Sequence, residues 1–497
     1  MQFLGMFRHV RTSHAQGLTK EMFVSLGQSA VSARDVYAQG GLIVMAEGEM
    51  RNRNTLTRAL KLSCDASMSL ITARAYRMWG ADYPRRIEGA VVTAVIDRAE
   101  DRMIVSADRA GAIGVYYAWR GRSAAFASHA SLLLKMGAAG RKIGREGVNE
   151  LFATGGFFTP GKTPFQDIRM LEGGCVLIAD SRGMRVKRYY SLVKSVLKKE
   201  NPPFSLADYI ETLPQKEYAL FLSNGLSMEM GKEIQNRGRA VFYHAEGSAD
   251  MEKDILSFSE SLNTPVECVS PRAEILTETL KETVTHTCFP GAGASEGIVF
   301  PLMKEAFCLF PTSLSGGRGA LCTENMLCGN LLRFLRKDVL YKADAQGYLR
   351  DRFNDLTDKL RIPLDMQGGE EWAERILCAL ACVPQYCARM RLLACAAGGE
   401  IKTPFSDERF FSSMLANLPD TENAHAPKEK LSEECAQIIM DEAREMAESE
   451  NQPIFEAVDP RQIRRELSQE RVDISNLARL IQINSFLYQF EAELTIS

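Results

Sequence analysis

Three things are scarce in this sequence: long apolar runs, an excess of charge of one sign, and closely spaced cysteine pairs. No apolar run approaches the ~18 residues that a membrane-spanning helix needs, and the apolar start, Met1–Arg8, is too short for a secretory signal. Basic and acidic residues number 60 and 63, a formal charge of −3. We therefore expect a cytoplasmic protein with no membrane and no nucleic-acid partner, in which any binding is local.

The 12 cysteines stand at irregular spacings, which argues against a disulfide framework and indicates free, buried thiols. The densest group, Cys378, Cys382, Cys387 and Cys395, holds no CxxC pair and lies where apolar residues recur at helical spacing. Cys378 and Cys382 share a helical face. Two hypotheses stay open for this group: packing in a core, which predicts no metal, or a thiol-ligated metal or iron–sulfur site.

The first part of the chain, to about residue 190, is rich in short apolar runs separated by glycine turns, which predicts strands. These runs are residues 41–45, 89–96, 102–106, 114–119 and 175–179. A charged stretch with two prolines follows at 198–203 and is typical of a linker.

Beyond the linker, strand-like runs alternate with segments long enough to be helices, which predicts a doubly wound parallel sheet. The runs are residues 218–222, 239–244, 265–269 and 308–314. From about residue 370 the pattern is mostly helical, with an acidic, polar interruption at 418–451. We predict a first domain over 1–192, a linker over 193–213 and a second domain over 214–497.

Short motifs that follow one another in order carry a family resemblance. In the first part, residues 45–56, 79–89, 108–117, 126–134 and 163–190 resemble the amidotransferase domain of glutamine-hydrolysing asparagine synthetases. In the second, 218–228, 315–320 and 403–408 are similar to the synthetase half. The resemblance implies an αββα sandwich of the N-terminal-nucleophile type, then an ATP-pyrophosphatase-type parallel-sheet domain with a helical C-terminal part. Lasso-peptide cyclases and β-lactam synthetases share this architecture.

The glutamine site that the resemblance implies has lost its chemistry. The family places a nucleophilic cysteine directly after the initiator methionine, where this chain has Gln2, whose carboxamide cannot attack a carbonyl. Glu47 stands in place of the family's asparagine, and Gly48 and Glu49 match it. We therefore expect a degenerate site that does not hydrolyse glutamine.

The nucleotide site that the resemblance implies is eroded as well. The family's pyrophosphate loop reads Ser-Gly-Gly-Leu-Asp-Ser, and this chain has Ser223, Asn224, Gly225, Leu226, Ser227 and Met228, without the carboxylate. A second loop holds Ser315, Gly316, Gly317 and Arg318, where Arg318 is either an anion-binding fork or a solvated side chain. ATP and Mg²⁺ are the cofactors implied, and the missing carboxylates argue against both.

Two functions stay open on this evidence. The first is a pseudoenzyme that binds a partner, either a peptide, as in modified-peptide biosynthesis, or an active synthetase-like protein, with a second copy of the chain as a further candidate. The second is a divergent ATP-dependent ligase or cyclase that forms an amide bond through carboxylate adenylation.

Overall fold

The computed structural model forms two compact units, which are described separately. Unit 1 comprises Met1–Arg141, Pro160–Asn201 and Phe405–Ser412, and unit 2 comprises Lys142–Thr159, Pro202–Pro404 and Ser413–Ser497. The structure describes residues 2–8, 22–154, 156–199, 202–214, 217–222, 226–235, 240–245, 249–264, 266–269, 273–291, 293–315, 331–365, 368–417 and 431–495.

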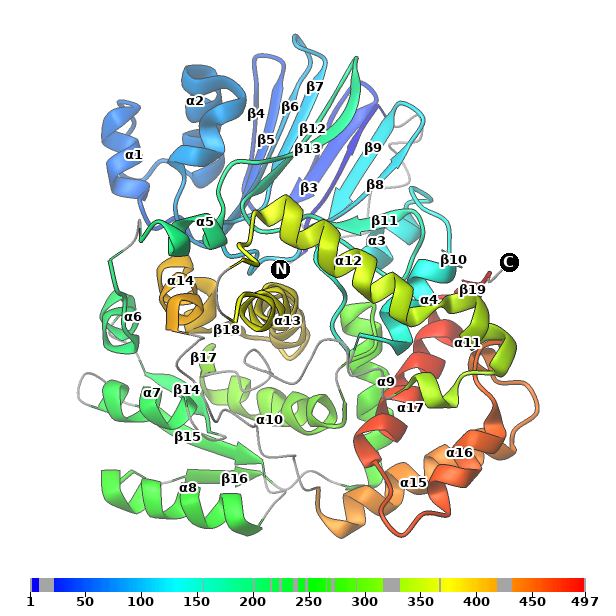
Figure 1. Ribbon diagram of the computed structural model, residues 1–497. Helices are drawn as coiled ribbons and strands as arrows, with labels where there is room; N and C mark the ends of the chain where they lie inside the picture. Colours follow the sequence, from blue (N-terminus) through cyan, green and yellow to red (C-terminus); the bar gives the residue numbers. More distant parts are fainter. Residues whose placement is uncertain are drawn as a thin grey trace. The chain divides into compact units, whose positions relative to one another are not determined.

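Unit 1 contains two six-stranded antiparallel sheets (Figure 1). In spatial order, the first sheet is β11 (Ile168–Met170), β8 (Tyr116–Arg120), β9 (Ser123–Ala127), β1 (Leu4–Phe7), β3 (Ser29–Ala33) and β2 (Met22–Leu26). The second is β13 (Gly183–Arg188), β12 (Cys175–Asp180), β7 (Arg102–Ser106), β6 (Val91–Asp97), β5 (Leu42–Gly48) and β4 (Val36–Gln39).

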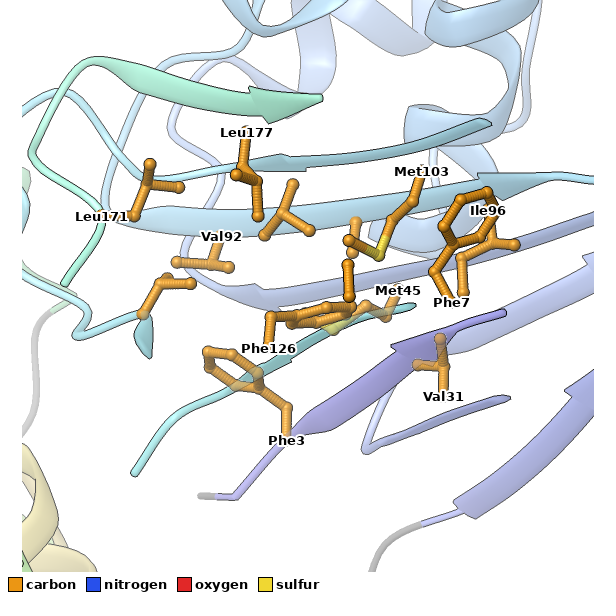
Figure 2. Close-up of a cluster of buried hydrophobic side chains, with 14 of the residues drawn as sticks. Phe3, Phe7, Val31, Met45, Val92, Ile96, Met103, Phe126, Leu171 and Leu177 are labelled. Carbon is orange, nitrogen blue, oxygen red and sulfur yellow. The ribbon is translucent and has the colours of Figure 1, made fainter. Parts of the chain in front are cut away.

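The core of unit 1 lies between these sheets. Phe3 and Phe126 of the first sheet pack in one cluster with Met45 and Val92 of the second (Figure 2). The outer face of the second sheet forms a second cluster with buried side chains of α2 (Met68–Trp79). Helix α3 (Ala130–Lys135) contacts β8 and β9 of the first sheet. The αββα sandwich expected from the resemblance is therefore confirmed.

Unit 1 also has three further short helical elements. They are α1 (Arg53–Ala59), the 3₁₀ helix η2 (Gly80–Arg86) and α5 (Leu192–Leu197). Ser67 begins α2, because its hydroxyl accepts the Leu70 backbone N–H at 3.2 Å and satisfies a donor that has no partner within the helix.

Unit 2 is built on a five-stranded, wholly parallel sheet. Its spatial order is β16 (Val266–Val269), β15 (Ala240–Ala245), β14 (Tyr218–Phe221), β17 (Thr312–Ser315) and β18 (Glu400–Lys402). Alternate residues of β14 face opposite layers: Leu220 packs with α7 (Leu226–Gln235) and α8 (Ala249–Leu262), and Phe221 with α10 (Ser295–Leu309) and α13 (Gly369–Ala396). The doubly wound sheet is thus confirmed, with one boundary wrong: Cys308 and Leu309 end α10.

The rest of unit 2 is mostly helical, as expected from about residue 370. Its remaining helices are α4 (Arg145–Phe152), α6 (Leu206–Thr212), α9 (Leu276–Thr287), α11 (Lys337–Ala343), α12 (Ala345–Leu360), α15 (Glu433–Glu448), α16 (Pro460–Leu467) and α17 (Ile474–Gln489). It also has 3₁₀ turns η3 (Ala273–Ile275), η5 (Leu332–Phe334) and η8 (Pro453–Glu456), and a short parallel pair, β10 (Lys142–Ile143) with β19 (Glu493–Leu494). The turn η6 (Pro404–Ser406) and α14 (Glu408–Asn417) each contain residues of both units.

Two features differ from the sequence prediction. The predicted linker, residues 193–213, contains most of α5 and all of α6. Among the described residues, α13 is long and apolar enough to cross a membrane by length and composition, and no such run was expected. The protein buries 72% of its most apolar window, as is usual for the core helix of a globular protein.

Candidate functional site

The first half of the predicted glutamine site lies at the start of β1. Gln2 is exposed, and the buried Phe3 lies between it and Leu4, the first residue of β1. The Phe3 N–H donates to the Ser128 hydroxyl at 3.2 Å, and the Ser128 N–H donates to the Phe3 carbonyl at 2.9 Å. The start of this strand is therefore fixed in position, and the residues there, Gln2 and Phe3, carry no nucleophile.

Sequence reasoning did not place a serine–histidine contact beside this strand. The Ser128 hydroxyl lies 2.8 Å from Nδ1 of His129, and both side chains are buried. Strand β9 brings them there, because Leu4 pairs with Ala127. The position of these two side chains beside β1 depends on the pairing of β1 with β9, which no local sequence pattern encodes.

The second half of the predicted site is the end of β5. Gly48 has φ +120, and a Cβ at this position would lie 2.1 Å from the Ala90 carbonyl oxygen, so only glycine fits. The Glu49 N–H donates to that same carbonyl at 2.8 Å. Glu47 is 3% exposed on the same strand, which puts a buried carboxyl where the family has a neutral amide. The turn therefore requires glycine at position 48, and the strand beside it carries a buried carboxyl group.

The core of unit 1 connects these two halves. Phe3, next to Gln2, and Ile113, whose Cδ1 would lie 2.6 Å from a Cβ on Gly48, belong to the same hydrophobic cluster. Gln2 and Gly48 are thus each adjacent to a member of this cluster, and neither belongs to it.

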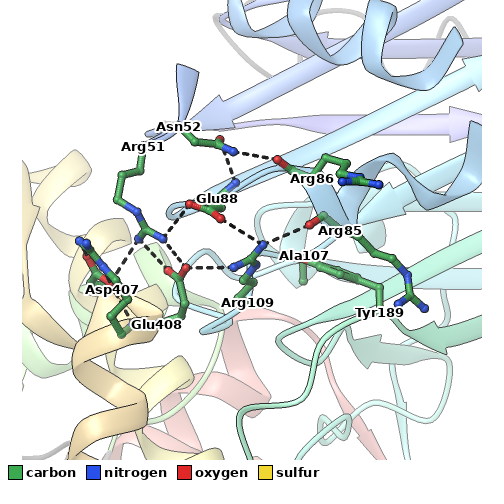
Figure 3. A network of polar contacts seen from close by, with 11 residues as sticks. Arg51, Asn52, Arg85, Arg86, Glu88, Ala107, Arg109, Tyr189, Asp407 and Glu408 are labelled. Atoms are coloured by element: carbon green, nitrogen blue, oxygen red, sulfur yellow. Dashed lines mark hydrogen bonds and ion pairs between the residues drawn. The ribbon is translucent and has the colours of Figure 1, made fainter. Parts of the chain in front are cut away.

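A charged network follows directly on β5, and two of its acidic members, Asp407 and Glu408, come from far along the chain (Figure 3). Arg51 donates to Glu408 at 2.5 and 2.9 Å and lies 3.3 Å from Asp407. Arg109 lies 3.4 Å from Glu408 and 3.8 Å from Glu88. The resemblance had assigned 403–408 to the synthetase half, whereas Phe405–Ser412 belongs to unit 1.

The network is balanced in charge and largely buried. Arg409 pairs with Asp407 at 2.6 Å, so three guanidinium groups face three carboxylates. Burial alone would lower the pKa of Arg51, but Glu408, Asp407 and Glu88 outweigh it and raise that pKa above its ordinary value. Because each charge is matched, the arrangement positions β5 and the Arg109 turn, and we assign it no substrate.

The predicted nucleotide loops begin at adjacent positions of the parallel sheet. Strands β14 and β17 are paired, with Phe221 opposite Ser315, and the strand order reverses between them. This is the switch point at which doubly wound sheets bind ligands. Ser223, Asn224 and Gly225, and also Gly316, Gly317 and Arg318, lie outside the described residues.

The described residues of these loops do not provide magnesium ligands. Ser227 is 1% exposed, and Met228 packs against the cluster that contains Leu220 and Leu222. Ser315 lies 3.0 Å from the Tyr386 hydroxyl of α13. The two positions where the family has a carboxylate and a hydroxyl thus carry a buried serine and a partly buried methionine, which does not fit a bound Mg²⁺.

The cysteine group predicted on a helix lies on α13. Cys378, Cys382 and Cys387 are buried and Cys395 is exposed. The sulfurs of Cys378 and Cys382 lie 3.7 Å apart and pack with Phe157. No cluster of three or more histidine, cysteine or carboxylate side chains that could hold a metal occurs among the residues described above.

Comparison with known proteins supports the relationship inferred for the first part of the chain. Residues 25–190 match the family of glutamine amidotransferase domains. The glutamine-hydrolysing asparagine synthetase 3 of Bacillus subtilis (strain 168) is 24% identical over 153 residues, 30% of this chain and 25% of that protein. The match therefore spans a quarter of the length of that relative.

Solved structures of amidotransferases resemble the chain at low sequence identity. One is glutamine phosphoribosylpyrophosphate amidotransferase of B. subtilis in complex with ADP and GMP, with 10% identity, a TM-score of 0.28, and 54% of this chain and 81% of that chain covered. Another is a glutamine aminotransferase class-II domain protein of Silicibacter pomeroyi, with 11% identity, a TM-score of 0.23, and 38% and 99% covered.

Proposed function

We propose that this chain, an asparagine synthetase-like protein with a glutamine amidotransferase-like domain, does not hydrolyse glutamine and acts by binding a partner. One observation carries the proposal. Gln2 and the buried Phe3 directly precede Leu4, the first residue of β1 in the amidotransferase-like sandwich, and neither side chain can attack an amide. Loss of the nucleophile of a catalytic unit lowers turnover by about 10⁶-fold in the best-studied hydrolases.

The polarity of the site supports the same conclusion. Amide hydrolysis places negative charge on an oxygen, which donors must stabilise. Glu47 offers a buried carboxyl where the family has an asparagine, and when ionised it only accepts hydrogen bonds. A carboxylate there would oppose the developing charge, so two independent requirements of glutamine hydrolysis are missing.

The segment at the end of β5 is well ordered by its contacts, and for this reason we infer a binding role and not a loss of folding. Gly48 keeps the positive φ that the turn demands, and the Arg51–Glu408 contacts hold the segment that follows it. The partner classes we infer are a peptide, as in modified-peptide biosynthesis, or a synthetase-like enzyme. We place the protein in the cytoplasm.

The test is a sensitive assay of glutamate release from glutamine with the purified full chain. We expect no release above buffer from the wild type. Ser128→Ala is the matched variant, because Ser128 is a hydroxyl beside the start of β1 and contacts His129. Glutamate release that this variant abolishes would overturn the proposal and identify a displaced nucleophile.

A second candidate function is an ATP-dependent amide ligase or cyclase. The observation that favours it is the pairing of β14 with β17 at the switch point, from which both candidate loops depart. ATP–pyrophosphate exchange with a carboxylate substrate would support it, and changing Ser223 or Arg318 to alanine should then abolish the exchange.

A further inference from the structure

A basic surface covers the outer elements of the second sheet in unit 1. Residues 51–86 contain eight arginines or lysines and two carboxylates, in a chain whose net charge is −3. Two of the eight are engaged in the fold: Arg51 pairs with Glu408, and Arg53 donates to the Ala66 carbonyl at 2.7 Å. The other six are exposed and define the basic surface: Arg58, Lys61, Arg74, Arg77, Arg85 and Arg86.

The fold determines why these side chains face solvent together. Leu56 of α1, Ile71 of α2 and Tyr83 of η2 pack on the outer face of the second sheet, so the opposite sides of the three elements point away from it. Arg74 and Arg77 are three residues apart on α2 and share its exposed side. Figure 1 shows α2 beside β4 and β5, with α1 next to α2.

Few acidic groups of the protein neutralise this surface. Within the described residues, Arg58, Lys61, Arg74, Arg77 and Arg86 form no ion pair with a carboxylate. Arg85 pairs with Asp82 at 3.5 Å, and both of these side chains are exposed. An exposed pair of this kind contributes little and exchanges readily for another partner.

A shallow pocket of about 450 Å³ lies within the surface and is lined by Trp79, Asp82, Arg85 and Arg86. The Arg86 guanidinium lies over the Trp79 ring at 5.7 Å, which orients its planar fork. Because its lining contains two arginines and one aspartate, the pocket has a net positive charge. A carboxylate is the group that such a fork binds in two-pronged geometry.

We propose that this surface binds an acidic peptide segment, with one carboxylate side chain seated in the pocket and others along Arg74 and Arg77. The inference names the partner class of the proposed binding function and rests on it. Single-stranded nucleic acid would need exposed aromatic rings for stacking, but Tyr76 and Tyr83 are buried and Arg86 covers Trp79. A membrane would need more apolar surface than Met78, the exposed large apolar side chain of residues 51–86.

The experiment uses fluorescence anisotropy with a labelled oligoglutamate peptide and the full chain at about 50 and 200 mM salt. We expect binding at the lower salt that weakens at the higher. The double variant Arg74→Glu/Arg77→Glu should raise the Kd at least about 10-fold. Arg86→Ala should raise it about 3-fold through loss of one charge-assisted contact.

A matched control separates a specific surface from general attraction to positive charge. Arg120 and Arg122 are also exposed in unit 1, beside the turn that joins β8 to β9. Their double change to glutamate should alter the Kd less than about 2-fold, since exposed charges beyond a Debye length are screened. All variants must keep the wild-type thermal unfolding profile.

Three results would overturn the inference. They are equal losses in the two double variants, binding of single-stranded RNA as tight as binding of the peptide, and no peptide binding at the lower salt. The assay contains no glutamine, so its failure leaves the glutaminase proposal standing. Conversely, glutamate release by the protein would overturn that proposal without touching this result.

Discussion

Each unit buries an arginine–glutamate pair, and the two pairs have different surroundings. In unit 1, Glu408 is 3% exposed at its side chain and is shared between Arg51 and Arg109. In unit 2, Arg389 holds Glu296 with two bonds of 2.5 and 2.8 Å, and its third contact is the Phe289 carbonyl at 3.0 Å. No second guanidinium contacts Glu296 among the contacts described for unit 2.

This difference predicts how strongly the stability of each unit depends on a single arginine. A carboxylate with two cationic neighbours keeps one when the other is removed, whereas a carboxylate with one becomes a buried, uncompensated charge. The charged centre of unit 1 therefore tolerates change, and that of unit 2 does not. Of the residues that the resemblance links to chemistry, Glu47, Gly48 and Glu49 directly precede this tolerant centre in the sequence.

The largest expected effect comes from removing the isolated cation. Arg389→Met should destabilise unit 2 by about 3–5 kcal/mol, because Glu296 stays buried without a partner. Arg51→Met should cost unit 1 about 1–2 kcal/mol, since Arg109 stays beside Glu408. Hydrogen exchange of peptides from each unit measures the two local stabilities separately.

The control for this comparison is Arg375→Met. Arg375 pairs with Glu371 on the exposed side of α13, where the glutamate is 69% exposed, and its loss should cost about 0.5 kcal/mol or less. Equal costs for Arg389→Met and Arg51→Met would remove the distinction between a shared and an isolated carboxylate.

The next effect tests whether the β5 turn keeps its shape through a close contact. Gly48 and Gly183 have φ of +120 and +111, but only the first lacks room, since a Cβ on Gly183 would meet nothing within 4 Å. Gly183→Ala should cost about 1 kcal/mol from backbone strain alone. Gly48→Ala should cost about 3 kcal/mol, because the Ala90 carbonyl must also move.

Urea unfolding of unit 1, followed by exchange of its peptides, measures this pair of variants. Because φ is nearly the same at both positions, their difference isolates the steric term. If the two alanine variants were equally stable, the Gly48 turn would not depend on its contact with Ala90.

A smaller effect concerns a buried acid in unit 2. The Glu150 carboxyl accepts hydrogen bonds from Tyr348 and from the Thr159 backbone and hydroxyl, and Arg352 lies nearby. Burial raises the pKa of Glu150 above its ordinary 4.5 despite these donors. The folded unit then holds a proton that the unfolded chain has lost, so this contribution to stability falls as pH rises above about 4.5.

Glu150→Gln removes that titration. Relative to this variant, the wild type should lose stability as pH rises from the ordinary pKa of the acid toward its raised value, and the difference should be constant below that window. Glu146→Gln, a change at an exposed acid on the same helix, controls for the loss of one carboxyl group from α4. Parallel stability curves for the wild type and Glu150→Gln would contradict the assignment.

The sequence predicted the layers of both units and missed the contacts that cross them. Apolar runs such as 89–96 predict strands because their pattern is local, and the structure has β6 there, at Val91–Asp97. The contact of Arg51 with Glu408 joins residues 357 positions apart, and no local pattern encodes it. The start of β17 was placed four residues early, because an apolar helix end at Cys308 and Leu309 reads like a strand.

The residues of the candidate sites were predicted, but most of their contacts were not. Gly48 was identified from the motif, and the structure gives its reason in the Ala90 contact. The partners of Ser128 and the packing of Met228 could not be read from sequence, since both depend on which strands and helices are neighbours.

The smallest expected effect is no change at all. It tests whether unit 2, unlike the glutamine site of unit 1, still binds its ligand. Millimolar Mg-ATP should shift the melting temperature of the full chain by less than about 1 °C, because no stabilisation follows without binding. Met228 is partly buried against the cluster that contains Leu220, and Ser227 is buried, so neither replaces the family's magnesium ligand. Ligand at ten times its Kd would add about 1.4 kcal/mol, roughly 2–4 °C for a unit of this size.

The matched control is magnesium pyrophosphate at equal ionic strength, which offers the anion without the nucleoside. A shift with Mg-ATP alone would mean that the strand ends at Phe221 and Ser315 still form a nucleotide site, and it would favour the amide-ligase function. A shift with both would indicate anion binding at the switch point without nucleotide specificity. Both results would show that loss of the carboxylate did not remove binding, because backbone N–H groups at such strand ends can hold a phosphate without a metal.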